Sequence, residues 1–306
     1  MTGHARGSPE PPDTGGVGGA TRQAARWATV GDARAHVTGR LAAAGVEPCE
    51  VDADLLIASV CGWTRPRVAL ERDTPLKAGT AAAIGALADR RAAREPLQRL
   101  LGEIGFRRLR LRVCDDVLVP RPETEVLAGL AIEATPPEGT VVDVGTGTGA
   151  VALAVADEAS PGLVVATDVS EAAVACAADN AQRRGLAVNV RLGDLLEAVP
   201  EQLRGEVDVL VSNPPYLTPE EVAAAAPEVA EHESREALVG GAGGQDVIWR
   251  LLAAAGQWLA PGGTVLVEGA TTRLAAAAER AKQLGLRGVG VQRDLAGRER
   301  VLVARR

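Results

Sequence analysis

Hydrophobic residues follow two different periodicities along the chain, and the change between them separates two regions. Between Trp27 and Arg94, apolar residues recur at helical spacings, with breaks at 45–48, 62 and 73–75. This pattern predicts a small bundle of short helices. From residue 140 onward, short apolar runs alternate with longer amphipathic segments. Such an alternation predicts β-α-β units and a parallel sheet that is covered by helices on both faces.

The expected elements of the second region can be placed by residue number. Strands are expected at 140–144, 163–168, 188–192, 207–212 and 263–268, and helices at 149–158, 170–184, 246–259 and 271–284. Two more strands, at 288–292 and 300–304, are joined by a turn, so an antiparallel hairpin is expected to close the sheet. The fold class is therefore α/β, with a Rossmann-like sheet of seven strands.

A second hairpin is expected between the two regions. Apolar residues alternate with arginine from Phe106 to Val113, which predicts a strand; 114–116 would form the turn and 117–119 the returning strand. A helix is expected to start near Glu123. The chain is thus divided into a disordered Gly/Pro-rich tail (1–25), a helical domain (26–95), a hairpin linker (96–120) and an α/β catalytic domain (121–306).

Composition and charge exclude some classes of function. The 306 residues are 46% hydrophobic and 24% charged, which is typical of globular proteins. Aromatic residues are only 2%, too few for a surface that stacks single-stranded bases. The net charge is +5 over residues 26–113 and −12 over 114–306. Proteins that grip phosphate backbones are normally basic, so direct binding of nucleic acid is not expected.

Cysteine and histidine are sparse and scattered. The four cysteines have no CxxC spacing, and the three histidines form no cluster, so neither a metal site nor a redox dithiol is expected. The cysteines are expected to be isolated core residues, which favours a reducing cytoplasm. No apolar run of membrane-spanning length occurs, and the N-terminus has no apolar signal core, so neither a membrane span nor export is expected.

A glycine-rich segment between an expected strand and helix is the first candidate for chemistry. Its glycines allow a tight turn and a close approach of the backbone to a ligand. Asp168 ends the next strand, where its carboxylate could accept both hydroxyl protons of a ribose. The pattern also satisfies a nicotinamide fingerprint, but an acid inside the strand and a third glycine favour S-adenosylmethionine. The candidate cofactor residues are Asp143, Gly145, Thr146, Gly147, Thr148, Gly149 and Asp168.

The second candidate is Asn213-Pro214-Pro215-Tyr216, which follows an apolar strand directly. The two prolines fix the backbone and remove two donors, so the Asn213 side chain and the Pro214 carbonyl are expected to face outward. Ligands bind at this end of strands in open α/β sheets. An amide oxygen and a carbonyl can together accept both protons of a planar NH2 group, and the Tyr216 ring could flank a sulfonium. These features predict an amino methyltransferase.

Together these motifs resemble the HemK/PrmC family, the protein-(glutamine-N5) methyltransferases of peptide-chain release factors. The resemblance covers about residues 27–306. It rests on the segments 95–97, 119–125, 143–149, 213–216 and 294–298, with Gly102 and Phe106.

The resemblance implies a function and further site residues. The chain would transfer a methyl group from S-adenosylmethionine to the glutamine of the release-factor GGQ motif, in the cytoplasm and as a monomer, with the helical domain docking the factor. Asp194 and Leu195 would lie near the adenine, although some relatives have an aromatic residue in place of Leu195. Asn213 would also contact the cofactor. The residues around the glutamine would be Asn213, Pro214, Pro215, Tyr216, Phe106, Arg121 and Glu123, and the whole segment 121–125 would line the same cavity.

Three other functions are compatible with parts of the pattern. Methylation of adenine N6, or of another amino group on nucleic acid or another protein, could use similar Asn-Pro-Pro-Tyr chemistry. Acting on nucleic acid needs a basic surface and base flipping. A binding module without catalysis would not need the intact motif at 213–216. A dehydrogenase would share the glycine-rich turn but not that motif.

Overall fold

The structure is a computed structural model and describes residues 27–306, so the tail expected at 1–25 lies outside the described residues. The chain divides into two compact units, one ending at Ala93 and the other starting at Arg94. The finer boundaries expected for the linker and the catalytic domain stay predictions.

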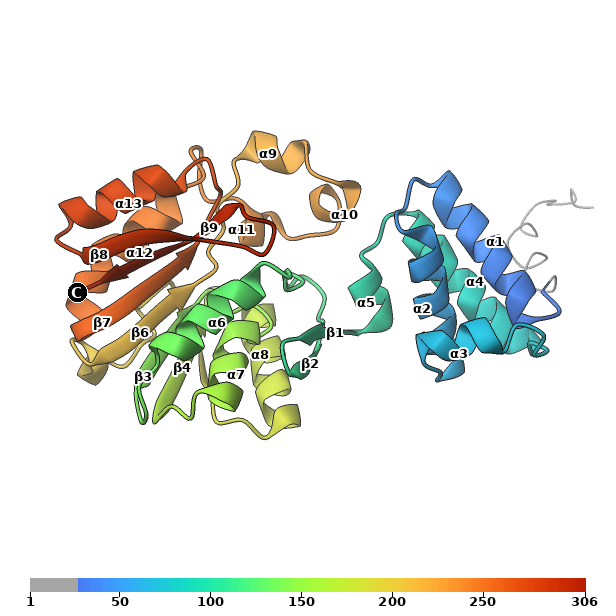
Figure 1. The fold of residues 1–306 in the computed structure, drawn as a ribbon, viewed down its shortest axis with the longest axis horizontal. Helices are drawn as coiled ribbons and strands as arrows, with labels where there is room; N and C mark the ends of the chain where they lie inside the picture. The colour runs from blue at the N-terminus through green and yellow to red at the C-terminus, as the bar shows by residue number, and fades with distance from the viewer. Residues whose placement is uncertain (1–26) are drawn as a thin grey trace, which may run out of the picture. The chain divides into compact units, whose positions relative to one another are not determined.

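The first unit is the expected bundle of short helices (Figure 1). A capping box at Thr29 starts α1, because its hydroxyl accepts from Asp32 N while the Asp32 carboxylate accepts from Thr29 N. Gly62, in the left-handed conformation, ends α2. The helices are α1 (Val30–Ala43), α2 (Cys49–Cys61), α3 (Arg65–Leu70) and α4 (Ala78–Ala92).

Two carboxylates of α2 connect this bundle by ion pairs. Asp52 and Arg91 are both buried, and their side chains approach to 2.7 Å, which joins α2 to α4. Asp54 pairs with Arg34 of α1. Because a buried charge is costly without a partner, these pairs specify how the helices pack more than they add net stability.

The second unit contains the expected seven-stranded sheet, in the order β5-β4-β3-β6-β7-β9-β8. The first five strands of this order are parallel, whereas β9 runs antiparallel to both β7 and β8, so the predicted closing hairpin is confirmed. The strands are β3 (Thr140–Val144), β4 (Leu163–Asp168), β5 (Asn189–Leu192), β6 (Val207–Ser212), β7 (Leu259–Glu268), β8 (Arg287–Arg293) and β9 (Glu299–Arg305).

Successive residues of the central strands enter two different cores, one on each face of the sheet. Val141 and Val209 pack with the helices of one face, whereas Val142 and Leu210 pack with those of the other. One face carries α6 (Thr124–Ala134), α7 (Ala150–Glu158) and α8 (Glu171–Arg184), and the other carries α12 (Asp246–Trp258) and α13 (Leu274–Gln283), as Figure 1 shows. Strands buried on both faces explain the continuous apolar runs in the sequence.

Short elements surround this sheet. The helix α5 (Leu97–Leu101) precedes the first hairpin, and the 3-10 turn η1 (Glu201–Leu203) precedes β6. Between β6 and α12, the chain forms three short helices, α9 (Pro219–Ala223), α10 (Pro227–Ala230) and α11 (Arg235–Leu238).

The register expected for the linking hairpin is wrong. Its strands are β1 (Glu103–Phe106) and β2 (Leu109–Arg112), with the turn at Arg107-Arg108, and residues 117–119 form no strand. Arg107 adopts a positive φ of 49°, and Glu158 of α7 holds its guanidinium at 2.7 Å. A tertiary ion pair therefore holds the arginine at this turn. The sequence contains no local turn motif that would predict the turn at this position.

The expectation of isolated cysteines is also wrong for two of the four. Cys114, just after β2, forms a disulfide with Cys176 of α8, 62 residues later. Cys176 is buried as expected, but its partner reaches it because β2 ends against α8. Cysteine usage therefore no longer favours a reducing compartment.

Asn180 of α8 holds the same end of the hairpin by hydrogen bonds. Its Nδ2 donates to the carbonyls of Arg112 and Thr148, at 3.1 and 3.0 Å, and its Oδ1 accepts from Arg112 N at 2.7 Å. The side chain is 1% exposed. One buried amide thus joins the hairpin, α8 and the glycine-rich loop.

We expect Asn180→Leu to lower the free energy of unfolding by at least about 2 kcal/mol, because it leaves buried backbone groups unpaired. Asn189→Leu is the matched control, since Asn189 is exposed on β5. Urea titration of both variants measures the difference, and equal midpoints would contradict the role given to Asn180.

Candidate active site

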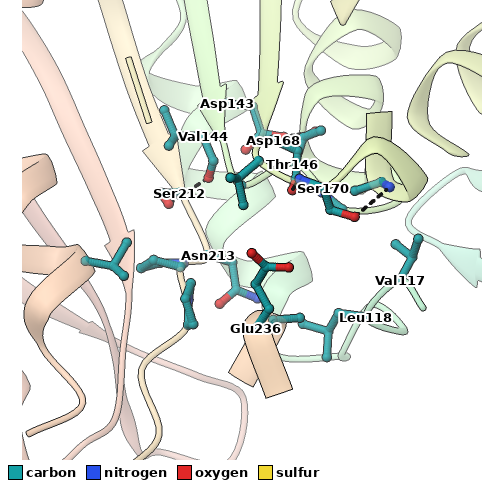
Figure 2. Close-up of a pocket in the computed structure, with 18 of the residues that line it drawn as sticks. Val117, Leu118, Asp143, Val144, Thr146, Asp168, Ser170, Ser212, Asn213 and Glu236 are labelled. Atoms are coloured by element: carbon teal, nitrogen blue, oxygen red, sulfur yellow. Dashed lines mark hydrogen bonds between the residues drawn. The ribbon is translucent and has the colours of Figure 1, made fainter. Parts of the chain in front are cut away.

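The two candidate motifs meet at the carboxyl-terminal edge of the sheet because β3 and β6 are neighbours. Val144 pairs with Ser212 in this register, and the Ser212 hydroxyl donates to the Val144 carbonyl at 2.7 Å. Figure 2 shows this bond between the two strand ends. A cavity of about 410 Å³ opens there, between the glycine-rich loop and Asn213-Pro214-Pro215.

The glycine-rich loop has the backbone that its sequence predicts. Gly145, Gly147 and Gly149 all have positive φ, of 70°, 57° and 83°. At Gly149 a Cβ atom would also lie 3.2 Å from the Cβ of Ala177, so a larger residue there would require α8 to shift slightly away from the start of α7. The glycines therefore serve both the turn and the packing of the helix behind it.

Asp143 supports this loop from beneath. Its Oδ2 accepts from the Thr146 hydroxyl at 2.7 Å and from Ala152 N at 3.1 Å. Burial raises the pKa of its carboxyl to about 6, against the effect of these two hydrogen bonds. Asp143 lines the cavity, but one of its oxygens is already used to hold the loop.

Asp168 is held by two backbone donors at the end of β4. Gly147 N donates to Oδ2 at 2.9 Å, and Ser170 N donates to Oδ1 at 3.0 Å. Burial raises the pKa of this carboxyl, and the charge of Glu236 acts in the same direction. Both carboxylates face the cavity in Figure 2.

The cavity is strongly acidic. Its one basic lining residue among those described is Arg250, whose guanidinium lies 2.6 Å from the Asp194 carboxylate. The field of the lining therefore favours a cationic ligand over an anionic one. The carboxylates that line it are Asp116, Asp143, Asp168, Asp194 and Glu236.

Asn213 and the two prolines that follow it lie at the inner end of this cavity. The Asn213 Nδ2 donates to the Thr124 hydroxyl at 3.2 Å, which leaves its Oδ1 available as an acceptor. Asn213, Pro214, Pro215 and Thr124 all line the cavity. An acceptor on rigid backbone thus lies next to a site for a cationic group.

Tyr216 is fixed at both its ends. Its hydroxyl donates to Glu268 Oε1 at 3.3 Å, and its carbonyl accepts from Arg273 at 2.9 Å. Burial is the main cause that raises the pKa of the Tyr216 phenol, and the nearby charge of Glu268 adds to it. The pKa is about 12, so the phenol stays protonated. Tyr216 is not among the residues that line the cavity and stands behind the prolines.

The structure places the other expected substrate residues away from the lining. Phe106 is 2% exposed and packs in the core beneath α6 and α7. Arg121 pairs with the buried Glu233 at 3.2 Å, and Glu123 pairs with Arg298 at 2.7 Å. These three residues support the walls around the site, and their contact with a substrate stays a prediction.

Several lining residues escaped the sequence analysis. Glu236 and Arg250 come from two consecutive helices, α11 and α12, and neither was a candidate. Val117 and Leu118, which lie across the pocket from Ser212 in Figure 2, belong to the segment that was expected to be a strand. Thr124, which also lines the cavity, belongs to the segment 121–125 that the resemblance implied would line it.

Comparison with known proteins agrees with this geometry. The family model described as the PrmC N-terminal domain matches residues 32–102, and the methyltransferase small domain matches residues 124–244. A release factor glutamine methyltransferase of Cereibacter sphaeroides is 40% identical over 276 residues, covering 90% of this chain and 97% of that protein. The chain belongs to the release factor glutamine methyltransferase family.

Other members of the family show the same extent of similarity. The protein of that name from Moorella thermoacetica is 38% identical, covering 91% of this chain and 99% of its own. The one from Streptomyces coelicolor is 42% identical, covering 78% and 84%. The resemblance to the HemK/PrmC family is thereby confirmed.

The described part of this family member shows neither a metal cluster nor a membrane helix. Residues 27–306 contain no group of three or more His, Cys, Asp or Glu that could hold a metal ion. No helix in the same range is both long and apolar enough to cross a bilayer.

The raised pKa of Asp143 predicts a dependence of stability on pH. The folded state binds a proton up to about pH 6, whereas the unfolded carboxyl loses it near its ordinary value of 3.8. The contribution of this group to stability therefore falls as the pH rises from about 4 to about 6. We expect Asp143→Asn, which carries no charge, to gain stability relative to wild type across that window.

Urea midpoints of the ligand-free proteins at several pH values measure this difference. Asp157→Asn, at an exposed position of the helix α7 that follows β3, is the control. A difference between Asp143→Asn and wild type that does not change with pH would contradict the prediction.

Proposed function

We propose that this protein transfers a methyl group from S-adenosylmethionine to the side-chain amide nitrogen of the GGQ glutamine in peptide-chain release factors. The observation that supports this most is an acidic cavity that ends directly at Asn213-Pro214-Pro215. Membership of the family indicates which substrate is methylated, since the relatives are named release factor glutamine methyltransferase.

The lining fits S-adenosylmethionine better than a dinucleotide. S-adenosylmethionine has a cationic sulfonium and an ammonium group, which suit the five carboxylates around the cavity. A nicotinamide cofactor has an anionic pyrophosphate, which the same field would repel. When bound, S-adenosylmethionine supplies an electrophilic methyl group. Gly145–Gly149, Asp168 and Asp194 would hold it.

The chain's own contribution is to orient a poor nucleophile. The lone pair of an amide nitrogen is delocalised into its carbonyl, so attack depends on alignment. The Asn213 Oδ1 and the Pro214 carbonyl would accept its two N–H groups and direct the nitrogen at the methyl. Orientation of reactants can supply roughly 7–11 kcal/mol of a barrier. The proton would leave after attack, so no base is required at the nitrogen beforehand.

The remaining expectations follow from this activity. The helical bundle would help to dock the release factor, and the enzyme would act as a monomer in the cytoplasm, where translation ends.

The decisive measurement uses methyl-labelled S-adenosylmethionine and a purified release factor, with a second factor whose GGQ glutamine is changed to alanine. We expect label on the intact factor alone. Label on both factors would place the methyl group elsewhere, and label on neither would contradict the proposed substrate.

We expect Asn213→Ala to lower kcat by at least about 100-fold, because the amide loses one of its two acceptors and its alignment. Binding of S-adenosylmethionine, measured by calorimetry, should change little, since the carboxylates and the glycine-rich loop stay intact. Asn189→Ala on exposed β5 is the control. Wild-type turnover in the Asn213 variant would refute this role.

A further inference from the structure

Two segments that are far apart in the sequence contribute to the wall of the cavity. The first wall segment is 116–120 and the second is 234–239. Their lining residues are Asp116, Val117, Leu118 and Pro120 from the first and Ser234, Glu236, Ala237 and Val239 from the second. Figure 2 shows the Glu236 carboxylate pointing into the cavity. Neither segment contains a strand of the large sheet, so strand pairing does not hold the two against each other.

A buried carboxylate connects the two wall segments. Glu233 directly precedes the second segment, and its side chain is 0% exposed. Its Oε1 accepts from Arg121, the residue after the first segment, at 3.2 Å. Its Oε2 lies 3.7 Å from the guanidinium of Arg99 in α5, an ion pair without a hydrogen bond. One carboxylate at the start of the second segment therefore faces two guanidinium groups.

Arg99 contacts both wall segments with its guanidinium. In addition to facing Glu233, it donates to the Val117 carbonyl at 3.4 Å. Its side chain is 11% exposed, so little solvent screens this contact. The second segment is thus tied to the first at both of its ends, through Val117 by Arg99 and through the backbone of Pro120 by Arg121.

Glu233 is the most buried of three glutamates that pair with arginine between β6 and α12. Glu221 pairs with Arg273 at 2.6 Å and Glu228 pairs with Arg94 at 2.7 Å, but their side chains are 41% and 19% exposed. Exposed pairs add little stability. A buried carboxylate that loses its partners is costly. The position of the second wall segment therefore depends most on Glu233.

This segment needs an anchor because it brings like charges together. The charge of Glu236 acts on Asp168, which lies at the strand ends, and both residues line the cavity. Two carboxylates on one cavity repel each other and attract a cation. Without a cation, their repulsion would push the second wall segment outward. The contacts of Glu233 with the two arginines oppose that movement.

We propose that Glu233 is a positioning residue, whose pairing with Arg121 and Arg99 holds the second wall segment in place so that Glu236 and Asp168 together attract the cationic cofactor. Glu233 is not among the lining residues, so it acts without touching the cofactor. This inference rests on the proposed function, since the cation is S-adenosylmethionine.

The first test measures how tightly the folded protein binds S-adenosylmethionine and its product S-adenosylhomocysteine, by calorimetry and without a release factor. Glu233→Gln keeps the shape but removes the charge that both arginines face. A wall that stays in place for only about a tenth of the time raises the apparent Kd about tenfold, and we expect at least that rise for both ligands. Glu231→Gln, the same change at an exposed position just before it, is the control and should keep the wild-type Kd.

Turnover distinguishes this role from a role in the methyl transfer itself. At saturating S-adenosylmethionine, kcat of Glu233→Gln should stay within about threefold of wild type, because only cofactor binding is weakened. Glu236→Gln should also raise the Kd. The double variant Glu233→Gln/Glu236→Gln should bind little worse than the weaker single variant, because Glu233 acts by placing Glu236.

Arg121→Gln supplies a second arm, which decides the matter should Glu233→Gln fail to fold. It removes the 3.2 Å hydrogen bond and leaves the carboxylate with Arg99. We expect its Kd for both ligands to rise, by less than in Glu233→Gln. The readout contains no release factor, so any contact of Arg121 with the substrate does not enter it.

The outcomes separate the inference from the function on which it rests. A wild-type Kd in folded Glu233→Gln or in Arg121→Gln would overturn the positioning role, even if the urea midpoint falls, because the pairing would then serve stability alone. Losses that multiply in the double variant would overturn it as well. A wild type that binds S-adenosylmethionine but labels no release factor would overturn the proposed acceptor and leave the role of Glu233 standing. A wild type that binds no S-adenosylmethionine would overturn both.

Discussion

The pairing of β3 with β6 is the constraint on which the rest of the site depends. It sets Val144 opposite Ser212, so the glycine-rich loop and Asn213 leave the sheet side by side. The hydroxyl of Ser212 on the Val144 carbonyl holds the two strand ends together where the ladder stops. In the proposed reaction, backbone register would therefore bring methyl donor and acceptor together, and the surrounding helices would contribute electrostatics and support.

Carboxylates perform two distinct tasks around this edge. Those that line the cavity create a field suited to a cationic cofactor. Those that are buried behind it, above all Asp143 and Glu268, hold polar groups in one orientation. Their raised pKa values reflect the cost of burying charge, which the protein tolerates at positions where the direction of a hydrogen bond matters.

The segment between the hairpin and α6 shows why part of the site could not be predicted. Alternating arginines correctly indicated a β-hairpin, but its turn lies at Arg107-Arg108 because Glu158 holds Arg107 there. The residues that follow were then free to line the cavity, and Cys114 could reach Cys176. Each of these features depends on a contact with a helix far along the chain.

The sequence by itself determined the α/β class, the order of strands and helices, the glycine-rich turn and the place of Asn213 at a strand end. These are local properties, set by periodicity, by positive φ at glycine and by proline stiffness. Only the tertiary structure decided that Thr124 accepts a hydrogen bond from Asn213, that Glu268 accepts one from Tyr216, and that the charge of Glu236 acts on Asp168. Side chains from distant helices and strands meet through packing, which leaves no periodic signal in the sequence.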